Sequence, residues 1–379
     1  MNEKEINSEL QCRIVRGLDS IAELSGDWDN LFKRAHKAPA YFSRAWVQTF
    51  ITEKRVKGRP LLITVWSDTK LVALLPLTVC NYLGIKVAKV APTTVLCYTG
   101  ILIDPNYQEA IRIVVEALFQ NKIAHVFYNK YLSSLDEPTN ELIAELIRHN
   151  FIFKRWKRHV CMWTKLEASF EQVLESRRTG EQRRWLLRKE RRVFKQGDVD
   201  VVCYAGKEIT PEITARVAAI QKDSWLKAEG KAILNQTFYQ KLLIELGKAG
   251  IGCIWLMTKD GDDVAFIYAL RVKNRLYPKW MSYRNKYGAS SSLSFGKILY
   301  IQMVRDACNK GISILDLGFG TDRWKNVWAT ERQSIDLIIS GRGFIGQLSS
   351  FICGMLLMCA KYKWRLHQHM KKFRMVNKK

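Results

Sequence analysis

The stretch Ile314-Leu-Asp-Leu-Gly-Phe-Gly-Thr-Asp-Arg-Trp-Lys-Asn-Val-Trp328 is the part of the sequence that decides the fold. Its apolar start, residues 312–317, predicts a buried strand, because apolar and polar residues do not alternate and a turn signal follows at once. Gly318 and Gly320 allow a sharp turn or a close approach of the backbone to a ligand. Ligands usually bind at strand ends in α/β proteins, although a glycine-rich strand exit can also be a plain turn.

Length and composition predict a globular protein with two domains. The chain has 379 residues, of which 47% are apolar, enough for two hydrophobic cores. Its nine cysteines are scattered, with no Cys-x-x-Cys pair and no Cys/His group at zinc spacing. The first residues, Met1-Asn-Glu-Lys-Glu-Ile6, lack an apolar signal region. We therefore expect reduced thiols, a cytoplasmic location and no metal site.

The positive charge is concentrated in two segments. Residues 177–195 carry +7 and residues 337–379 carry +9 of the net charge of +25. Local basicity of this kind favours polyanionic partners such as a cofactor phosphate, an anionic lipid, a nucleotide-linked sugar or RNA. Solvated basic faces explain each segment equally well.

The two halves of the chain show a similar order of expected elements. Hairpins are predicted at 60–79 and 253–272, each after two helices, and the second has the strong turn signal Asp260-Gly261. Ser43 is the expected N-cap of a helix over 43–52. The last clear strand is 312–317. This order predicts an α/β (α+β) fold with an internal duplication, each half a mixed, mostly antiparallel sheet flanked by helices.

The expected domain bounds follow from these elements. An N-terminal half spans 10–167, a basic linking helix 168–197 and a C-terminal half 198–342, and an apolar and then basic tail covers 343–379. The apolar part of the tail is shorter than the twenty or so residues that a membrane-spanning helix needs. Leu348, Phe351, Ile352, Met355, Leu356 and Cys359 share one helical face. That face predicts either packing against the domain or peripheral contact with an anionic membrane.

Several passages together resemble the GNAT-superfamily acetyltransferase domain of CelD-type cellulose-biosynthesis proteins, which is related to Fem-type peptidyltransferases. In the second half they are 183–197, 223–225, 260–266, 292–297 and the opening stretch; in the first half they are 41–46, 71–77 and 98–104. Each motif is loose, but their joint order over residues 18–339 is fairly specific. The resemblance implies two tandem GNAT-like units and transfer of an acyl group, usually from acyl-CoA, to an amine.

The resemblance also implies where the donor binds. Acetyl-CoA or another acyl-CoA is expected as the co-substrate, with its pyrophosphate at the start of the helix 295–310. The expected donor-binding residues are Ser292, Ser294, Phe295, Gly296 and Lys297. The usual GNAT phosphate loop is not matched, because Arg284-Asn-Lys-Tyr-Gly-Ala289 places its glycine one position late. A simple N-cap at Ser294 is the alternative.

The same resemblance suggests catalytic and acceptor residues. Asp316 is expected to accept a proton or orient the acceptor amine, and Lys325 to stabilise the oxyanion or bind a donor carbonyl. An Asp316–Lys325 ion pair that only fixes the turn fits equally well. The expected acceptor-binding residues are Trp225, Arg184, Arg188, Tyr283 and Trp324.

The sequence therefore predicts an acyl-CoA-dependent N-acyltransferase, most simply an acetyltransferase, acting on an amino group of an envelope or polysaccharide-related precursor. The acceptor is a small molecule or a glycan precursor. Two alternatives stay open: a Fem-like transferase that uses aminoacyl-tRNA, and a non-catalytic GNAT-like module in a membrane-associated polysaccharide assembly. Beyond a tRNA donor, no nucleic acid partner is expected.

Overall fold

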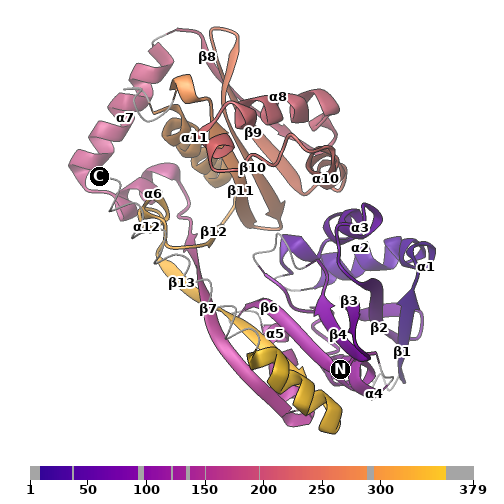
Figure 1. The fold of residues 1–379 in the computed structure, drawn as a ribbon. Coiled ribbons are helices and arrows are strands. Elements are labelled where there is room, and N and C mark those ends of the chain that lie inside the picture. Colours follow the sequence, from indigo (N-terminus) through magenta and orange to yellow (C-terminus); the bar gives the residue numbers. More distant parts are fainter. Residues whose placement is uncertain are drawn as a thin grey trace, which may run out of the picture. The chain divides into compact units, whose positions relative to one another are not determined.

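The computed structural model describes residues 9–35, 38–92, 98–120, 123–133, 137–149, 151–195, 197–287 and 294–355. The chain forms two compact units, each assembled from separate segments of the sequence (Figure 1). Unit 1 consists of Met1–Ala38, Lys54–His159 and Ser334–Lys379. Unit 2 consists of Pro39–Glu53 and Val160–Gln333.

Unit 1 is a mixed sheet with helices. Its strands follow one another in the order β1-β2-β3-β4-β6-β13, with the short β5 beside β3. Within the described part of this unit, β4 and β6 are the named strands that pair in parallel, at Val87↔Val126 and Ala88↔Phe127. The strands are β1 (Leu10–Arg16), β2 (Arg59–Ser67), β3 (Lys70–Tyr82), β4 (Ile85–Val90), β5 (Leu102–Ile103), β6 (Val126–Ser133) and β13 (Glu331–Gly341), and the helices are α1 (Leu18–Glu23), α2 (Ser25–Arg34), α4 (Ala110–Gln120) and α5 (Glu137–His149).

Unit 2 repeats the plan with more helices. Its strand order is β7-β12-β11-β10-β9-β8, and only β11 and β12 pair in parallel. Its strands are β7 (Phe151–Lys165, shared with unit 1), β8 (Val199–Ala205), β9 (Gly252–Lys259), β10 (Asp262–Val272), β11 (Arg275–Tyr283) and β12 (Ile314–Phe319). Its α-helices are α3 (Arg44–Thr52), α6 (Phe170–Arg177), α7 (Gly180–Lys195), α8 (Pro211–Lys222), α9 (Trp225–Ala228), α10 (Thr237–Lys248), α11 (Phe295–Asn309) and α12 (Arg323–Asn326). Three short 3₁₀ helices complete the set: η1 (Ala40–Phe42) and, farther along, η2 (Gly206–Glu208) and η3 (Asn285–Tyr287).

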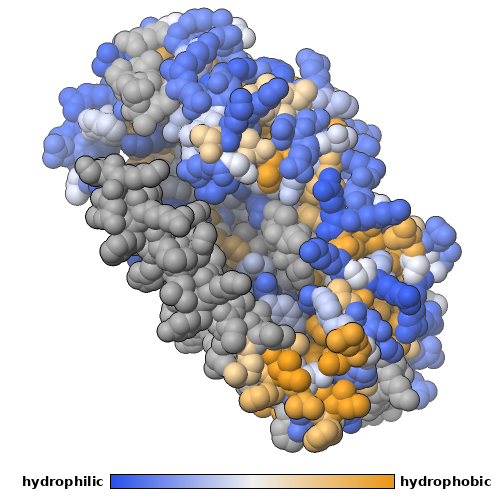
Figure 2. Space-filling model, in the orientation of Figure 1, coloured by the Kyte–Doolittle hydropathy of each residue, from blue (hydrophilic) through white to orange (hydrophobic). Residues whose placement is uncertain are grey.

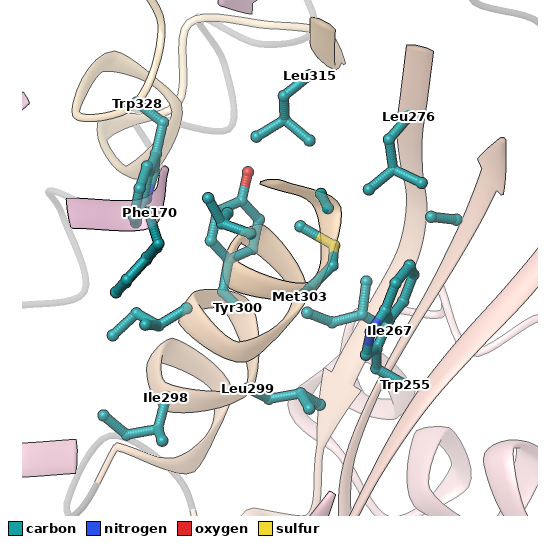
Figure 3. Packing of buried hydrophobic residues seen from close by; sticks show 14 of the residues in the cluster. Phe170, Trp255, Ile267, Leu276, Ile298, Leu299, Tyr300, Met303, Leu315 and Trp328 are labelled. Atoms are coloured by element: carbon teal, nitrogen blue, oxygen red, sulfur yellow. The ribbon is translucent and has the colours of Figure 1, made fainter. Parts of the chain in front are cut away.

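The core of unit 2 lies on both faces of its sheet. Alternate residues of β9 and β10, such as Trp255, Met257 and Ile267, pack against α11 and α6. Their neighbours along the strands are buried as well, on the face covered by α8 and α10. Burial on both faces explains why these strands are nearly continuous apolar runs. Figure 3 shows Tyr300 of α11 rising between Trp328 and Leu315, and burial raises the pKa of its hydroxyl.

The structure confirms the predicted fold class and several local signals. The hairpin β9–β10 forms across Asp260 and Gly261, both at positive φ. The Ser43 hydroxyl accepts a hydrogen bond from the Trp46 backbone N–H at 3.3 Å, so Ser43 is an N-cap. The prediction of 312–317 as the last strand was wrong in two ways. The strand is Ile314–Phe319, and a further strand, β13, follows it and pairs with β6.

The units also differ from the expected domain bounds. Residues 39–53 join unit 2, although they were expected in the half spanning 10–167. Conversely, residues 334–342 join unit 1 rather than the half spanning 198–342. Periodicity predicts helices and strands but not which elements they pack against. The sequence pattern therefore could not predict that residues 39–53 and 334–342 belong to the other unit.

Residues 343–355 form a helix that leaves β13 and packs on unit 1 through small residues. A Cβ atom on Gly346 would lie 2.6 Å from the His125 carbonyl oxygen, so the helix backbone touches the sheet directly. The large apolar side chains of this helix face outward, which corrects the expectation that they pack against the domain. Leu356 and Cys359 lie outside the described residues. Within the described ranges, no helix is long and apolar enough to cross a membrane.

Candidate functional site: the parting of β11 and β12

The two parallel strands of unit 2 separate after a short contact. β11 and β12 pair only at Arg275↔Ile314 and Leu276↔Leu315 (Figure 1). From Tyr277 on one strand and Asp316 on the other, the backbones no longer pair. A central sheet strand whose neighbour leaves it exposes unpaired backbone groups and the side chains of both strands along the gap. We take this parting as the candidate site.

A β-bulge in β11 lies beside the parting. Tyr268 pairs with Trp280 and Ala269 with Pro278, so Lys279 is the extra residue. The four residues 278–281 are all half-buried, although β11 is an interior strand. Bulges leave backbone groups outside the ladder and redirect side chains, and they are frequent beside active sites. An amide released in this way can donate a hydrogen bond to a ligand carbonyl in the gap.

An aromatic cluster covers one face of the bulge. Trp46 stacks on Trp280 with ring centroids 6.3 Å apart, and Tyr41 meets Tyr277 edge-on at 5.9 Å. The Lys279 ammonium lies over the Tyr41 ring, 4.9 Å from its centroid. The segment 39–53 thus supplies aromatic side chains to the sheet of unit 2. The ring quadrupole thus holds the ammonium group of Lys279 against the buried residues Tyr41 and Trp46, which fixes the bulge to this cluster.

Lysine side chains gather at the start of α11. Ser294 precedes the helix in a left-handed conformation, φ 53° and ψ 53°, and its hydroxyl caps no helix N–H. Instead the hydroxyl accepts a hydrogen bond from Lys189 Nζ of α7 at 2.9 Å. Burial and the nearby charges of Lys297 and Arg192 lower the pKa of Lys189. Together with the helix dipole, these cations form a site suited to a phosphate group.

A buried ion pair fixes α7 in this position. Glu190 accepts hydrogen bonds from both terminal nitrogens of Arg305 in α11, at 2.5 and 3.0 Å, and one from Gln302 at 2.6 Å. Glu190 is only 8% exposed. Bidentate pairs of this kind define geometry as well as energy. Lys189 directly precedes Glu190 in α7. The Glu190–Arg305 ion pair therefore also holds Lys189 at the start of α11.

Gly296 packs closely against Tyr283, and its expected part in donor binding stays a prediction. A Cβ atom at this position would lie 2.9 Å from Cδ1 of Tyr283. The glycine therefore accommodates the tyrosine ring, which packs against the first turn of α11. Tyr283 belongs to the core edge of unit 2, and Phe295 is fully buried there with 1% exposure. Lys297 is exposed in the first turn, while Ser292 lies outside the described residues.

The two expected catalytic residues have separate partners. Asp316 lies at the first unpaired position of β12, 1% exposed, where one carboxylate oxygen accepts the Gly318 N–H at 3.0 Å and the other lies 3.5 Å from Arg275 Nη1. Lys325 donates to the Phe319 carbonyl oxygen and lies 3.5 Å from Asp322. The described contacts thus join Lys325 to Asp322 and the strand end, and Asp316 to Arg275. Asp316 is the one at the gap.

The expected acceptor residues are exposed but dispersed. Trp225, which helical spacing also allowed in the core, is 43% exposed at the start of α9. Trp324 is 38% exposed and meets Tyr300 edge-on at 5.5 Å. Arg184 and Arg188 are exposed on the outer face of α7. Their roles in binding stay predictions.

Sequence reasoning missed Lys189, Arg275 and Lys279. Lys189 sits in a run of basic residues in which spacing alone cannot single it out. The position of Lys279 depends on a β-bulge, and no turn residue in the sequence indicates that bulge. Arg275 follows a hairpin turn and looks like an ordinary surface residue. Among the described residues, no group of three or more His, Cys, Asp or Glu side chains could hold a metal ion.

Comparisons with known proteins bear on the fold of this part of the chain. Residues 180–326 match the model of the acetyltransferase (GNAT) domain. No curated protein sequence matches the chain. Among solved structures, the chain is similar to FemX, with a TM-score of 0.59 and 12% identity over 83% of this chain and 95% of that one.

Two further solved structures show the same likeness. One is the C-terminal domain of a putative lysylphosphatidylglycerol synthetase from Agrobacterium fabrum, with a TM-score of 0.57 and 12% identity over 89% of this chain and 96% of that one. The other is a conserved protein of unknown function from Bacteroides thetaiotaomicron, with a TM-score of 0.51 and 10% identity over 88% and 100% of the two chains. At these identities the likeness establishes the fold. Residues 180–326 therefore form a GNAT-fold, acyltransferase-like domain.

Proposed function

We propose that unit 2 transfers an acyl group from acyl-CoA, in the simplest case acetyl-CoA, to an amine. The observation that carries the proposal is the cationic start of α11 beside the parting of β11 and β12. Lys189 Nζ and Lys297 bracket a helix N-terminus, and the parting lies between the strands that flank this helix in the sequence. A phosphate at the helix start and an extended arm along the gap match the shape of a CoA thioester.

The reaction needs few groups from the protein. The amine nitrogen attacks the thioester carbonyl, the new C–N bond forms, and the C–S bond breaks to release the thiol. A backbone amide in the bulged segment 280–281 is proposed to stabilise the oxyanion. Asp316, at the first unpaired position of β12, orients the amine and receives its proton directly or through water. Arg275 positions the Asp316 carboxylate.

The acceptor is proposed as an amino group on an envelope or polysaccharide-related precursor. It is proposed to approach the gap at the half-buried bulge residues of β11, since Tyr41 and Trp46 are themselves buried. Arg184 and Arg188 offer charges to an anionic part of such a precursor. Trp225, Tyr283 and Trp324 are proposed to contact the acceptor or the acyl chain.

Aminoacyl-tRNA is a second candidate donor. The resemblance to Fem-type transferases implies it, and the exposed cations along α7 favour a nucleic acid. The same parting would then receive the aminoacyl end of the tRNA. The two donors differ in the length of phosphate backbone that they present, so salt dependence separates them.

Calorimetric titration with acetyl-CoA tests the proposal. Wild type is expected to bind, and Lys189→Ala to weaken binding by about tenfold or more, because a charged hydrogen bond contributes roughly 1.5–3 kcal/mol. Lys207→Ala, an exposed lysine of η2, is the matched control and should bind as wild type does. A titration with bulk tRNA forms the second arm.

Each outcome decides between the donors. Binding of acetyl-CoA that depends on Lys189 supports the acyl-CoA proposal. Binding of tRNA with a steep salt dependence, and none of acetyl-CoA, replaces it with the aminoacyl-tRNA donor. If neither ligand binds, the enzyme proposal fails and a non-catalytic module is the better description.

A further inference from the structure

The helix over residues 343–355 turns its large apolar side chains to solvent. Exposure reaches 81% for Phe344 and 59% for Ile345, and the other members lie between 43% and 51%. We define the apolar helix face as Phe344, Ile345, Leu348, Phe351, Ile352 and Met355. In Figure 2, orange residues gather where Figure 1 shows this helix in yellow. Contiguous exposed apolar surface on a globular protein marks an interaction site.

The outward direction of this face is built into the packing. Gly346, Ser349, Ser350 and Gly354 are buried, and their spacing of three and four residues places them on one stripe of the helix. A Cβ atom on Gly341 would lie 2.2 Å from the Gly346 carbonyl oxygen. Such backbone contact leaves no room for a leucine or phenylalanine, so the apolar face cannot rotate inward without lifting the helix off the sheet.

The surroundings of the helix are basic and aromatic. Cys353 packs on Val87, Val126, Leu337 and Ile339, which fixes the sheet face that the helix covers. On the nearby strands, Lys89 lies over the Tyr128 and Tyr82 rings, with its Nζ 5.6 and 5.8 Å from their centroids. Leu83, at the β3–β4 turn next to Tyr82, is fully exposed. Apolar, tyrosine and lysine side chains in one area are the composition of a membrane-interface surface.

The sequence that follows the helix adds charge of the same sign. Residues 356–379 contain eight lysine and arginine residues and no aspartate or glutamate. A protein partner with an apolar surface would not require this excess of cations, whereas an anionic bilayer attracts each of them by about 1 kcal/mol. Apolar insertion and electrostatic attraction together are the two signals that stable peripheral binding needs.

We propose that the apolar helix face docks unit 1 on an anionic lipid surface. The helix lies in the plane of the interface, with Phe344, Leu348 and Phe351 among the acyl chains and the lysines of the surrounding strands at the headgroups. The stripe of small residues, Gly346, Ser349, Ser350 and Gly354, stays packed on the sheet and so connects the helix to unit 1. This proposal is independent of the donor that unit 2 uses.

Vesicle flotation with the full chain tests the proposal. Wild type should float with vesicles of phosphatidylglycerol and phosphatidylcholine, and Leu348→Glu/Phe351→Glu should reduce the bound fraction by about tenfold or more. The control is Ile147→Glu, which changes a 55% exposed residue of α5. α5 lies on the opposite face of the sheet, because Ile143 packs with Ile338, the strand neighbour of Leu337 and Ile339. The control should float like wild type.

Vesicle binding at high salt and the oligomeric state of the variants can contradict the proposal. In 1 M salt, where the screening length is about 3 Å, wild type should keep part of its vesicle binding through the apolar face. If the double variant floats as wild type does, the basic sequence alone binds and the proposal is overturned. If wild type ignores the vesicles and the double variant converts a dimer to a monomer, the face joins two copies of the chain instead. Circular dichroism verifies that the variants are folded.

Discussion

The two units share one topological device and differ in what lies beside it. Each sheet has a single parallel pair, β4–β6 in unit 1 and β11–β12 in unit 2, and each pair is two residues long. In unit 1, Thr99 forms a bridge to Leu132 of β6 beyond that pair. In unit 2, no segment within the described ranges bridges to β12 beyond Leu315 on the side of β11. A segment of the protein's own chain follows the parallel pair in unit 1, whereas none of the described segments does so in unit 2.

In each unit a helix lies between the two parallel strands in the sequence, α4 in unit 1 and α11 in unit 2. The charges at the starts of these two helices differ as well. The segment before α4 in unit 1, Asn106-Tyr-Gln-Glu109, contains an acidic residue and no lysine or arginine. The start of α11 in unit 2 has Lys297 in its first turn and Lys189 bonded to Ser294. The first turn of α4 does contain Arg112, but Arg112 pairs with Glu116 of the same helix at 3.7 Å, whereas two lysines gather at the start of α11.

The largest expected effect comes from the ion pair between Glu190 and Arg305 in unit 2. Glu190→Ala removes three hydrogen bonds and leaves Arg305 without its carboxylate. Because a charged group loses its partner in a mostly buried site, the free energy of unfolding should fall by about 3 kcal/mol. Urea denaturation measures it. Glu181→Ala, an exposed residue of the same helix, is the control and should change stability by less than about 0.5 kcal/mol; an equal loss in both variants would refute the anchor.

The start of α11 should be intolerant of a single added methyl group. Gly296→Ala places Cβ against the Tyr283 ring, and overpacking of this kind costs about 1–3 kcal/mol. Thermal denaturation of Gly296→Ala, Tyr283→Ala and the double variant should show strong coupling, with the double variant less destabilised than the sum. Gly26→Ala, in the helix α2 of unit 1 with open space around it, should be neutral or stabilising. Additive losses would show that Tyr283 is not the obstacle.

The side chain of Thr99 in unit 1 should contribute to stability and not to the affinity for the donor. Thr99 donates its hydroxyl to the Lys130 carbonyl oxygen at 2.5 Å and lies 3.2 Å from Asn129 Oδ1. Thr99→Val should lower the free energy of unfolding by about 1–2 kcal/mol, since buried polar groups lose a partner. Calorimetric affinity for acetyl-CoA should stay at the wild-type value. A loss of affinity would mean that unit 1 takes part in donor binding, contrary to the comparison of the two gaps.

The smallest expected effect is a pH dependence at the cationic helix start. Burial and neighbouring cations lower the pKa of Lys189, so its ammonium loses the proton at a lower pH than the value of about 10.4 for an ordinary lysine. Affinity for a phosphate-bearing ligand should therefore fall a few-fold as pH rises toward that value from below. Lys189→Arg, which stays protonated, should show a flatter profile in calorimetry. Identical profiles for the two proteins would remove Lys189 from the site.

Periodicity and turn chemistry predict much of the fold. The β9–β10 hairpin follows from the turn signal Asp260-Gly261 between two apolar runs, and the helix at 44–52 follows from its serine cap. The partners of these elements were beyond prediction, because pairing depends on contacts far apart in sequence. The helix α3 contributes Trp46 to a sheet strand more than two hundred residues away. β13 was missed, since its apolar run is short and carries no turn signal that separates it from the preceding loop.

The site was predicted less completely. Asp316 was identified from its place at the end of an apolar run, and it does lie at the parting of the strands. Lys189 and Lys279 depend on a helix-to-helix contact and on a bulge, which a residue pattern does not encode. The tail shows the same limit. Spacing predicted an apolar face on 343–355 but could not tell that Gly346 and Ser350 would occupy the inner side.

The exchange of segments between the units has a consequence for biosynthesis. Unit 1 requires β13, which is complete only at Gly341, and unit 2 requires α3, which leaves the ribosome before any strand of its own sheet. Unit 2 therefore cannot complete its fold before Gln333 is made, nor unit 1 its sheet before Gly341, although multidomain proteins commonly fold one domain after another during synthesis. The aromatic side chains of residues 41–50 must stay soluble through nearly three hundred further residues of translation. The aromatic cluster around Trp46 and Trp280 thus forms only after most of the chain has been made.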